Sequence, residues 1–453
     1  MNVAEQIVAQ LVDAGVHRIY GIVGDSLNPI VDAVRKTGGS KKGGIDWIHV
    51  RHEEAAAFAA SAEAQLTGKL AVCAGSCGPG NLHLINGLYD ANRTGAPVLA
   101  IASHIPSVQI GTTYFQETHP DRIFEECSVY NELISSAAQS PRTVNSAIRH
   151  AVGLGGVSVI TLPGDVSDLK AVEHVPTYAP ARPATLAPNA ADIEEAAALL
   201  NKANKVAIFA GAGVEGAHDE VIALADALKA PIGHSLRGKH FIQYDNPFDV
   251  GMTGLLGYGA AAEGMNDADV LILLGTDFPY DQFLPDTPTI QVDTHAEKLG
   301  RRTDVGLAIH AQVKPFIEAL LPHLRTNRSD SFLKSKIKKH SEIMHAPVGA
   351  YTRNVEKMRP IHPEYAAHLL NETAAKDAIF TADTGMCNVW TARYIDPLGT
   401  RRLIGSLLHG SMANALPMAL GAQVAYPDRQ VVSVSGDGGL SMLLGELITA
   451  KMY

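Results

Sequence analysis

Short apolar segments alternate with helical segments along most of this chain, and this alternation restricts its fold more than any other feature. Four apolar segments near the start are typical of strands, at residues 18–24, 47–50, 70–75 and 97–103. Helical patterns separate them, over residues 27–36, 53–66 and 82–92. Repeated strand–helix units of this kind form parallel sheets with helices on both faces. The predicted fold class is therefore α/β, with doubly wound parallel-sheet domains.

The chain is too long for a single hydrophobic core. Linker-like segments divide it into three blocks of alternating strands and helices, which predict three domains. A first block runs over residues 1–175, and Pro176, Pro180, Pro183 and Pro188 then indicate a linker. A second alternating block covers residues 190–325, and a third covers residues 355–453. A helical pattern over residues 438–452 closes the third block, which we expect to be incomplete.

Composition excludes several classes of protein. The net charge is 37 − 47 = −10, which disfavours a nucleic-acid partner held by bulk electrostatics. Four cysteines (Cys73, Cys77, Cys127 and Cys387) make no disulfide framework, and no His/Cys pair follows Cys77 at zinc-finger spacing. Buried free thiols in a reducing cytoplasm are expected. The start of the chain has no secretory signal pattern, and no apolar run reaches the ~20 residues that span a bilayer.

Glycine-rich turns follow three strands of the first block, in GIVGDS, AGSCGPG and LPGD. Ligands of open parallel sheets bind outside the carboxyl ends of the strands, where such turns lie. Glycine is also favoured in any strand-to-helix turn, so each motif alone has a structural explanation. Glu53, in RHEEAAAF, begins a helix and would stabilise the positive end of its dipole, which is likewise a sufficient structural role.

The second block contains Gly211, Gly213 and Gly216 in the G-x-G-x-x-G spacing. No acid follows about 20 residues later, so NAD binding in the Rossmann manner is disfavoured. The glycines remain compatible with a helix N-terminus that faces a phosphate. Asp293 ends the strand TIQVD and would suit a ribose, although aspartate is also a common turn residue.

Two strands of the third block end in acids beside glycine, Asp383 in TADTG and Asp437 in SGDGG. The N–H groups of such turns hold diphosphates, and a neighbouring carboxylate suits Mg²⁺. The position of GDGG between the strand VVSVS and an apolar helical pattern strengthens this interpretation.

Taken together, the segments resemble the thiamin-diphosphate enzyme family, and more closely its quinone-linked pyruvate oxidases. The resemblance covers all 453 residues in order. Its most specific parts are GIVGDSLN, VRHEEAAAFAA, AVCAGSCGPGNLHLINGLYD, FQETHP, LRGK, DNPFDVGMTGLLGYG, LLGTDFPY, HGSMANALP and SGDGG.

The resemblance implies a pyrimidine-binding domain, a central FAD-binding domain and a diphosphate-binding domain, in that order. Glu53 would bind the pyrimidine ring and promote its imino tautomer, and Met412 would hold the cofactor in its bent shape. Four residues would line the substrate side: Ser26, His83, Phe115 and Gln116. Asp437 would bind Mg²⁺, Gly438 and Gly439 would donate N–H groups to the diphosphate, and Gly385 would also be a cofactor-binding residue. The FAD positions are Gly211, Gly213, Arg237, Gly275, Thr276 and Asp293.

The implied reaction converts pyruvate to acetate and carbon dioxide and passes two electrons through FAD to a membrane quinone. The family's active centre lies between two subunits, so a homodimer is the expected minimum and a homotetramer the usual state. The full-length protein would lie in the cytoplasm, peripheral to the inner face of the cell membrane. The family's metal motif closes with an asparagine, and the 453 − 437 = 16 residues after Asp437 contain none. We therefore expect little turnover from the 453-residue form.

Other functions stay open at this stage. An acetolactate synthase and a non-oxidative 2-oxo acid decarboxylase share the three-domain plan, and a decarboxylase would lack bound FAD. A third alternative is not an enzyme: a truncated, non-catalytic paralogue that binds FAD.

Overall fold

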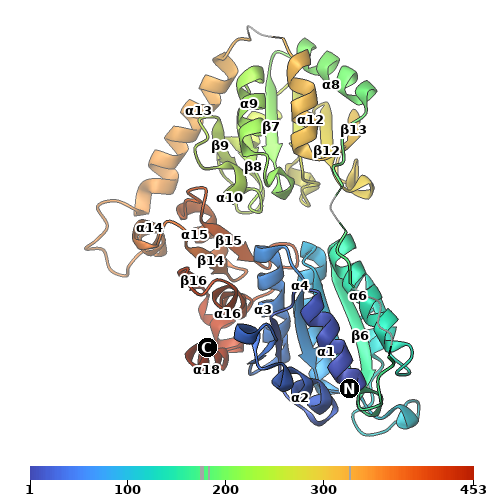
Figure 1. The fold of residues 1–453 in the computed structure, drawn as a ribbon. Helices are drawn as coiled ribbons and strands as arrows, with labels where there is room; N and C mark the ends of the chain where they lie inside the picture. The colour runs from blue at the N-terminus through green and yellow to red at the C-terminus, as the bar shows by residue number, and fades with distance from the viewer. Residues whose placement is uncertain (174–177, 182–183, 326–327) are drawn as a thin grey trace. The chain divides into compact units, whose positions relative to one another are not determined.

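The computed structural model describes residues 1–173, 178–181, 184–325 and 328–453. The chain forms two compact units (Figure 1). The first unit comprises Met1–Arg182, Ile379–Cys387 and Ile404–Tyr453, and the second comprises Pro183–Ala378 and Asn388–Leu403. Pro176 and Pro183 of the predicted linker lie outside the described residues.

The first sheet has six parallel strands in the order β2-β1-β3-β4-β6-β5. The strands are β1 Arg18–Gly21, β2 Asp46–His49, β3 Ala71–Gly75, β4 Val98–His104, β5 Tyr130–Leu133 and β6 Val157–Pro163. Its longer helices are α1 Val3–Asp13, α2 Asn28–Thr37, α3 Glu53–Thr67, α4 Pro79–Thr94 and α6 Ser140–Leu154. Shorter turns of helix are η1 Asp25–Leu27, η2 Ser40–Lys42, η3 Ser107–Gln109, α5 Pro120–Ile123 and α7 Gly164–Ser167.

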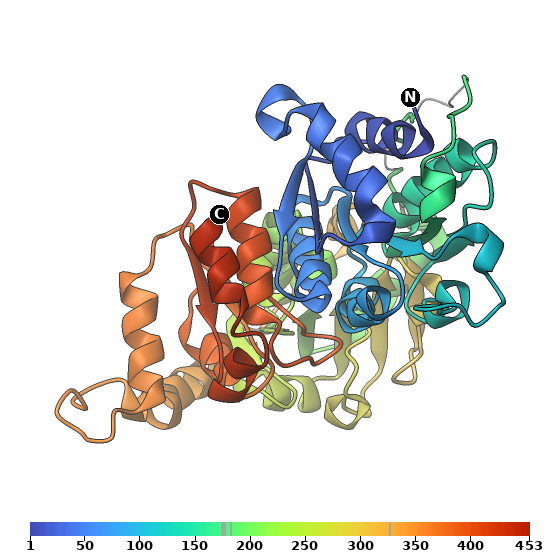
Figure 2. The same ribbon diagram turned by 90° about the horizontal axis from the view of Figure 1, so that it is seen from below.

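Helices cover both faces of this sheet, as Figure 2 shows from below. Residues of α1, α2 and α6 form one core with Val72 and Ala74 of β3. Residues of α3 and α4 form the other core with Ala71 and Cys73 of the same strand. Because successive side chains of a strand point to opposite faces, an apolar strand such as β3 supplies both cores.

α3 packs against α16 (Ala415–Ala425) within the first unit. Alanine makes up much of α3, and the small side chains let the helix backbones approach closely. A Cβ at Gly421 of α16 would overlap the carbonyl oxygen of Ala59, so this contact requires glycine. The alanine-rich sequence of α3 therefore allows α16, which belongs to the last predicted domain, to pack closely against the first predicted domain.

The second sheet has seven strands in the order β10-β9-β8-β7-β11-β12-β13, and only the β9–β10 pairing is antiparallel among the pairings described. The strands are β7 Val206–Ala210, β8 Ile232–His234, β9 Asp249–Met252, β10 Tyr258–Gly259, β11 Val270–Leu274, β12 Thr289–Asp293 and β13 Leu307–His310. The helices of this part are α8 Ala190–Lys202, α9 His218–Leu228, α10 Lys239–Ile242, α11 Ala261–Asn266, α12 Val313–Leu320, α13 Ser331–Ile343 and α14 Pro363–Thr373. Short turns of helix are η4 Ala212–Val214, η5 Asp281–Phe283, η6 Ala296–Lys298, η7 Leu321–His323, η8 Met344–Val348 and η9 Gly349–Tyr351.

The third sheet has three strands in the order β15-β14-β16. They are β14 Ile379–Ala382, β15 Arg402–Gly405 and β16 Val431–Val434, and β14 pairs with β16 in parallel. Its helices are α15 Met386–Tyr394, α16, α17 Asp437–Met442 and α18 Glu446–Met452. The single helix suggested by the pattern over residues 438–452 is wrong, because the chain leaves the helical conformation at Leu443 (φ −121°, ψ 33°) and starts a second helix at Glu446.

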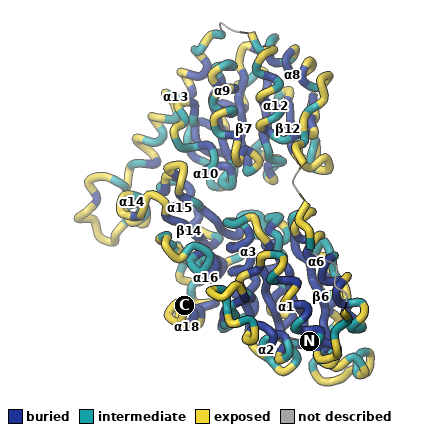
Figure 3. The backbone as a smooth tube through the Cα atoms, viewed as in Figure 1, coloured by how far each residue is buried: buried dark blue, intermediate teal, exposed yellow. Residues whose placement is uncertain are grey.

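The central strands are buried on both faces, as the dark blue tube in Figure 3 shows for β6, β7 and β14. This burial confirms the predicted fold class of doubly wound parallel sheets. All four cysteines are free and buried, as expected. In the part of the chain that the structure describes, no helix has both the length and the apolar character needed to cross a bilayer. The domain boundaries drawn from the sequence stay a prediction.

Candidate active site

Glu53 is the first residue of α3 and is buried, with 7% of its surface exposed. Its Oε2 atom lies 3.0 Å from Nδ1 of His83 on α4. The ring of His83 stacks on that of His52 at 4.3 Å, and Nδ1 of His52 accepts a hydrogen bond from the backbone N–H of Glu54. The structure therefore brings two of the predicted residues, Glu53 and His83, into direct contact.

The turn between β3 and α4 runs close to both Glu53 and Gln116. A Cβ at Gly80 would lie 3.0 Å from Oε1 of Glu53. Gly78 has φ +68°, and a Cβ there would lie 2.9 Å from Cβ of Gln116. These glycines are needed both for the conformation of the turn and for its close approach to two candidate site residues.

A pocket of about 580 Å³ opens at the carboxyl ends of β1, β4 and β6, and it is lined by Ser26, Phe115 and Gln116 among other residues. Gln116 is held by the thiol of Cys77, which donates to its Oε1 atom at 3.2 Å, and Phe115 is 79% exposed. The strand order reverses between β1 and β3, and an open α/β sheet binds ligands at such a reversal. Glu53 and His83 are not among the lining residues of this pocket.

The hydroxyl of Ser26 is held from two sides. Its Oγ atom lies 2.6 Å from Oγ of Ser103 and 3.0 Å from Oγ of Ser76. It also accepts the backbone N–H of Cys77 at 3.1 Å. Ser26 therefore belongs to a fixed polar network at the pocket wall.

His104 lines the same pocket and is absent from the residues predicted from the sequence. It ends β4, is only 3% exposed, and its Nδ1 atom is buried without a hydrogen-bond partner. Burial lowers the pKa of His104 below its ordinary value, so the imidazole is neutral near pH 7. Its position directly after the strand segment PVLAIAS is the signal that would have identified it.

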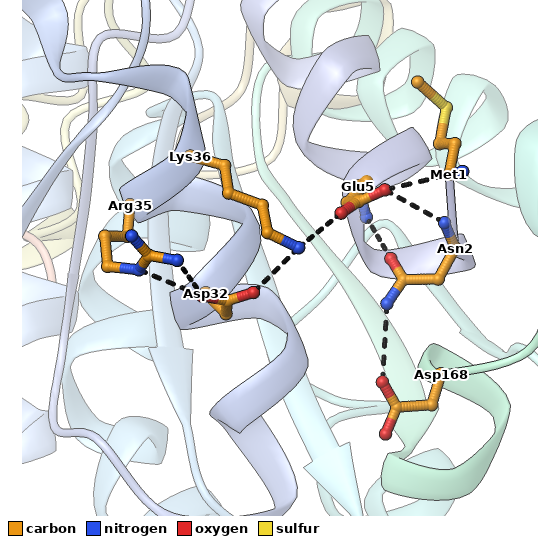
Figure 4. A network of polar contacts seen from close by, with 7 residues as sticks. All are labelled: Met1, Asn2, Glu5, Asp32, Arg35, Lys36 and Asp168. Atoms are coloured by element: carbon orange, nitrogen blue, oxygen red, sulfur yellow. Dashed lines mark hydrogen bonds and ion pairs between the residues drawn. The ribbon is translucent and has the colours of Figure 1, made fainter.

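The rim of the pocket is acidic, but its carboxylates are engaged. Asp32 binds Arg35 at 2.7 Å and Lys36 at 2.9 Å. Lys36 also binds Glu5, as Figure 4 shows. These contacts with Lys36 lower the pKa values of both Asp32 and Glu5. Asp168 accepts a hydrogen bond from Asn2, whose own side chain caps α1 (Figure 4).

Asp383 follows β14 and is almost completely buried, with 1% of its surface exposed. Its Oδ1 atom accepts the backbone N–H of Ala415 at 2.8 Å, whereas its Oδ2 atom is buried without a partner. Burial raises the pKa of Asp383. A Cβ at Gly439 would overlap Oδ2, so the glycine turn after β16 lies directly against this carboxylate.

The other predicted residues of the third part lie in the turns after β14 and β16 or beside them. Asp437 is exposed as the first residue of α17. Cε of Met412, which is 44% exposed, lies 3.1 Å from the position of a Cβ at Gly438. Gly385 lies in the turn after β14 with φ +139°, and a Cβ there would meet open space.

This turn fits a magnesium diphosphate group. The buried oxygen of Asp383 lacks a partner, and the neighbouring glycines leave space that a side chain would fill. Over the described residues, no group of three or more His, Cys, Asp or Glu side chains is arranged to hold a metal ion. Mg²⁺ commonly takes only one or two protein carboxylates and completes its shell with phosphate oxygens and water, so the residues present suit that ion with a phosphate ligand.

In the second unit, the predicted glycines pack against one another. A Cβ at Gly213 would lie 2.6 Å from Cα of Gly275, and a Cβ at Gly211 would overlap Cβ of Thr276. The N–H of Gly211 donates to Leu274, and the N–H of Gly213 donates to Gly275. These glycines therefore shape the turns, and their own N–H groups are already used within the fold.

Polar residues lie at the same edge of the second sheet. Arg237 follows β8, and Asp293 ends β12 with 7% of its surface exposed. Oδ1 of Asp293 accepts the backbone N–H of His295 at 2.9 Å. The strand order reverses between β7 and β11, where the turns of Gly211 and Gly275 lie. Arg237 and Asp293 lie at or just after the ends of strands on either side of this reversal, at the edge where open α/β sheets bind ligands.

Three family models match the chain. The first is the thiamine pyrophosphate enzyme N-terminal TPP binding domain, at residues 1–123. The second is the central domain of thiamine pyrophosphate enzymes, at residues 193–320. The third is the C-terminal TPP binding domain of the same enzymes, at residues 383–453.

Curated relatives agree with these matches. An uncharacterized 42.6 kDa protein in the isoamylase 3'region of Pseudomonas amyloderamosa is 54% identical over 73% of this chain and 83% of its own length. The pyruvate oxidase of Lactiplantibacillus plantarum is 30% identical over 97% of this chain and 73% of its own length. The acetolactate synthase of Mycobacterium bovis is 30% identical over 99% of this chain and 74% of its own length.

Proposed function

This chain belongs to the thiamine pyrophosphate enzyme family, and on that premise we propose that it oxidises pyruvate to acetate and carbon dioxide. Pyruvate and water would give acetate, carbon dioxide, two protons and two electrons. FAD would take up the electron pair and a membrane quinone would accept it. The observation that carries the proposal is the buried Glu53 carboxylate at the start of α3, in contact with His83.

Thiamin diphosphate, when bound, supplies the nucleophilic carbon and the electron sink for decarboxylation. Glu53 would hold a proton at the pyrimidine ring, with His83 fixing the orientation of its Oε2 atom. Gly438 and Gly439 would receive the diphosphate, Gly385 and Met412 would border it, and Asp437 would bind Mg²⁺. The buried, unpartnered oxygen of Asp383 supports a bound cation at this turn.

Residues of the pocket would bind and orient pyruvate. Ser26 and Gln116 present polar groups that hydrogen bonds already hold in place, and neutral His104 adds an N–H donor or an acceptor. Phe115 is exposed and would exclude water from the reacting carbon once substrate is bound. Pre-positioned groups of this kind lose little entropy when the substrate binds.

The second unit would hold FAD at the carboxyl edge of its sheet, near Gly211, Gly275 and Thr276, with Arg237 and Asp293 as polar partners. The strand-order reversal at this edge supports a nucleotide site. The pyruvate oxidase relative, which matches nearly the whole chain, supports oxidation over simple decarboxylation. A homodimer or homotetramer that meets the membrane from the cytoplasmic side completes the proposal.

The visible absorption spectrum tests this function. The purified protein is expected to show a flavin band that bleaches slowly, over a single turnover, when pyruvate, thiamin diphosphate and Mg²⁺ are added without oxygen, with acetate as the product. A flavin band that pyruvate leaves unchanged would contradict the oxidase reaction. Absence of flavin would contradict the FAD assignment and favour a decarboxylase.

The acetolactate synthase relative supports a second candidate function, because its identity to this chain equals that of the pyruvate oxidase. An acetolactate synthase joins two pyruvate molecules with loss of one carbon dioxide and needs no net oxidation. Product analysis separates the two functions, since acetolactate without acetate would identify the synthase.

A further inference from the structure

Glu446 is a buried carboxylate near the end of the chain, and it is not among the site residues predicted from the sequence. It is the first residue of α18 and is 1% exposed. Its Oε1 atom accepts the backbone N–H of Arg51 at 2.8 Å and that of His52 at 3.0 Å. The hydroxyl of Thr449 donates to its Oε2 atom at 2.7 Å.

The two amides bound by Glu446 immediately precede the helix that begins at Glu53. Residues in the short connection between β2 and α3 have no strand or helix of their own to satisfy these N–H groups. An N–H that is partly withdrawn from water is costly to leave without a partner, so the two hydrogen bonds to Glu446 stabilise this connection. Its negative charge also lies at the positive end of the α3 dipole.

Other contacts from the same segment hold the connection in place. The hydroxyl of Tyr453 accepts the backbone N–H of His49 at 2.9 Å. Leu443, between α17 and α18, belongs to the buried core that α3 and α4 form with the first sheet. The end of α3 that carries Glu53 is thus bound to a segment almost 400 residues later in the chain, with a sequence separation of 395 for Arg51 and Glu446.

We propose that Glu446 is a positioning residue for Glu53. It fixes the backbone of Arg51 and His52, and these set the direction in which α3 starts and the place of its first side chain. His52 transmits the same constraint through its ring, which caps α3 and stacks on His83, the partner of Glu53. The inference rests on the proposed function, because it assigns Glu446 to the group that would act on thiamin diphosphate.

Amide hydrogen exchange of the cofactor-free protein, read by mass spectrometry over a peptide spanning residues 46–58, is the first test. In Glu446→Ala, the amides of Arg51 and His52 lose their acceptor, and their exchange is expected to speed up by about tenfold or more. Glu446→Gln keeps an acceptor oxygen and is expected to restore most of the protection. Unchanged exchange in Glu446→Ala would overturn the inference.

Glu63→Ala is the matched control. Glu63 is also a buried glutamate, lies on α3 itself, and binds Arg18 and Tyr20 instead of the start of the helix. This variant is expected to lower stability without changing the exchange of Arg51 and His52. Equal effects of Glu63→Ala and Glu446→Ala on these two amides would show a general loss of stability and would contradict a positioning role.

The second readout is the rate at which the C2 proton of bound thiamin diphosphate exchanges with deuterium, at saturating cofactor and Mg²⁺. Glu446→Ala is expected to slow this exchange by about tenfold or more, since a displaced Glu53 loses its near-attack geometry. An unchanged rate in a variant with unprotected amides would reduce Glu446 to a structural role. If the wild-type protein itself fails to accelerate C2 exchange, the proposed function fails, and the amide exchange still decides whether Glu446 fixes this connection.

Discussion

Oε2 of Glu53 lies 3.0 Å from Nδ1 of His83, although Glu53 is the first residue of α3 and His83 lies in the first turns of α4, after a different strand. Glu53 follows β2 and His83 follows β3, and both strands end at the same edge of the first sheet. The contact joins a buried acid to an exposed imidazole, which is an arrangement suited to holding a proton where a ligand arrives.

Replacement of Glu53 by glutamine should lower kcat/KM for pyruvate by about 10²–10⁴-fold, because the amide cannot exchange a proton with the cofactor. Glu54→Gln is the control, since Glu54 is the adjacent acid and binds Asn86 instead of His83. Pyruvate oxidation measured with an artificial electron acceptor compares the two variants. A loss of less than about threefold in Glu53→Gln would exclude this residue as the proton-holding group.

Gly439→Ala and Gly436→Ala form a matched pair in the same turn. A Cβ at Gly439 would overlap Oδ2 of Asp383, whereas a Cβ at Gly436 would meet nothing within 4 Å. Gly439→Ala is expected to cost about 1–3 kcal/mol of stability through overpacking and to weaken the binding of thiamin diphosphate and Mg²⁺. Gly436→Ala should leave stability nearly unchanged. Thermal unfolding with and without cofactor measures both, and equal behaviour of the two variants would contradict the close contact with Asp383.

Gly213→Ala is expected to destabilise the second unit, since its Cβ would lie 2.6 Å from Cα of Gly275 and force two turns apart. Flavin content of the purified variant should fall with it. Gly264→Ala is the control, because Gly264 lies within α11 and a Cβ there has its closest neighbour at 3.7 Å. That substitution should be stabilising by about 0.5–1 kcal/mol. Normal flavin content in Gly213→Ala would argue against a flavin site at this edge.

Lys239 predicts a pH effect on the stability of the second unit. It is 2% exposed, and burial lowers its pKa from 10.5 to about 8. Between these values the unfolded chain holds a proton that the native chain has released, so stability rises as pH increases from about 8 to about 10.5. The slope is at most about 1.4 kcal/mol per pH unit.

Lys239→Met removes this titration, and Gln243 still donates to the hydroxyl of Tyr258, which Lys239 also contacts. The variant should be more stable than the wild type at pH 7, and its advantage should shrink as pH approaches 10. Thermal unfolding at a series of pH values gives this difference directly. An advantage that is constant with pH would mean that Lys239 keeps an ordinary pKa.

The residues near Glu53 show which features the local sequence pattern predicted and which it did not. The run EEAAAFAASAEAQL predicted a helix, and α3 covers Glu53–Thr67. The family resemblance named Glu53 and His83 separately, and only the structure shows their contact, because the two residues are 30 positions apart. Glu446 was missed altogether, since an acid at the start of a short helix looks like an ordinary surface residue until its acceptor role is visible.

Two further elements depended on distant partners. No helix was predicted between the second and third blocks, yet α13 forms over Ser331–Ile343. Lys336 of that helix is 5% exposed and pairs with Glu263 and Asp267, about 70 residues earlier. The helical pattern over residues 438–452 was broken in two at Leu443, whose side chain enters the core of the first unit.

The amino-acid sequence by itself determined the fold class and the places of the glycine turns. Alternating apolar strands and helices bury both faces of a sheet, and only glycine permits the positive φ at Gly78 and the close approach at Gly213. The tertiary structure decided which groups meet: Ser26 with Gln116 at one pocket, Asp383 with Gly439, and Glu446 with the start of α3. Periodicity reports the burial of one segment, whereas a site depends on distances between segments, which the packing of the sheets and helices alone sets.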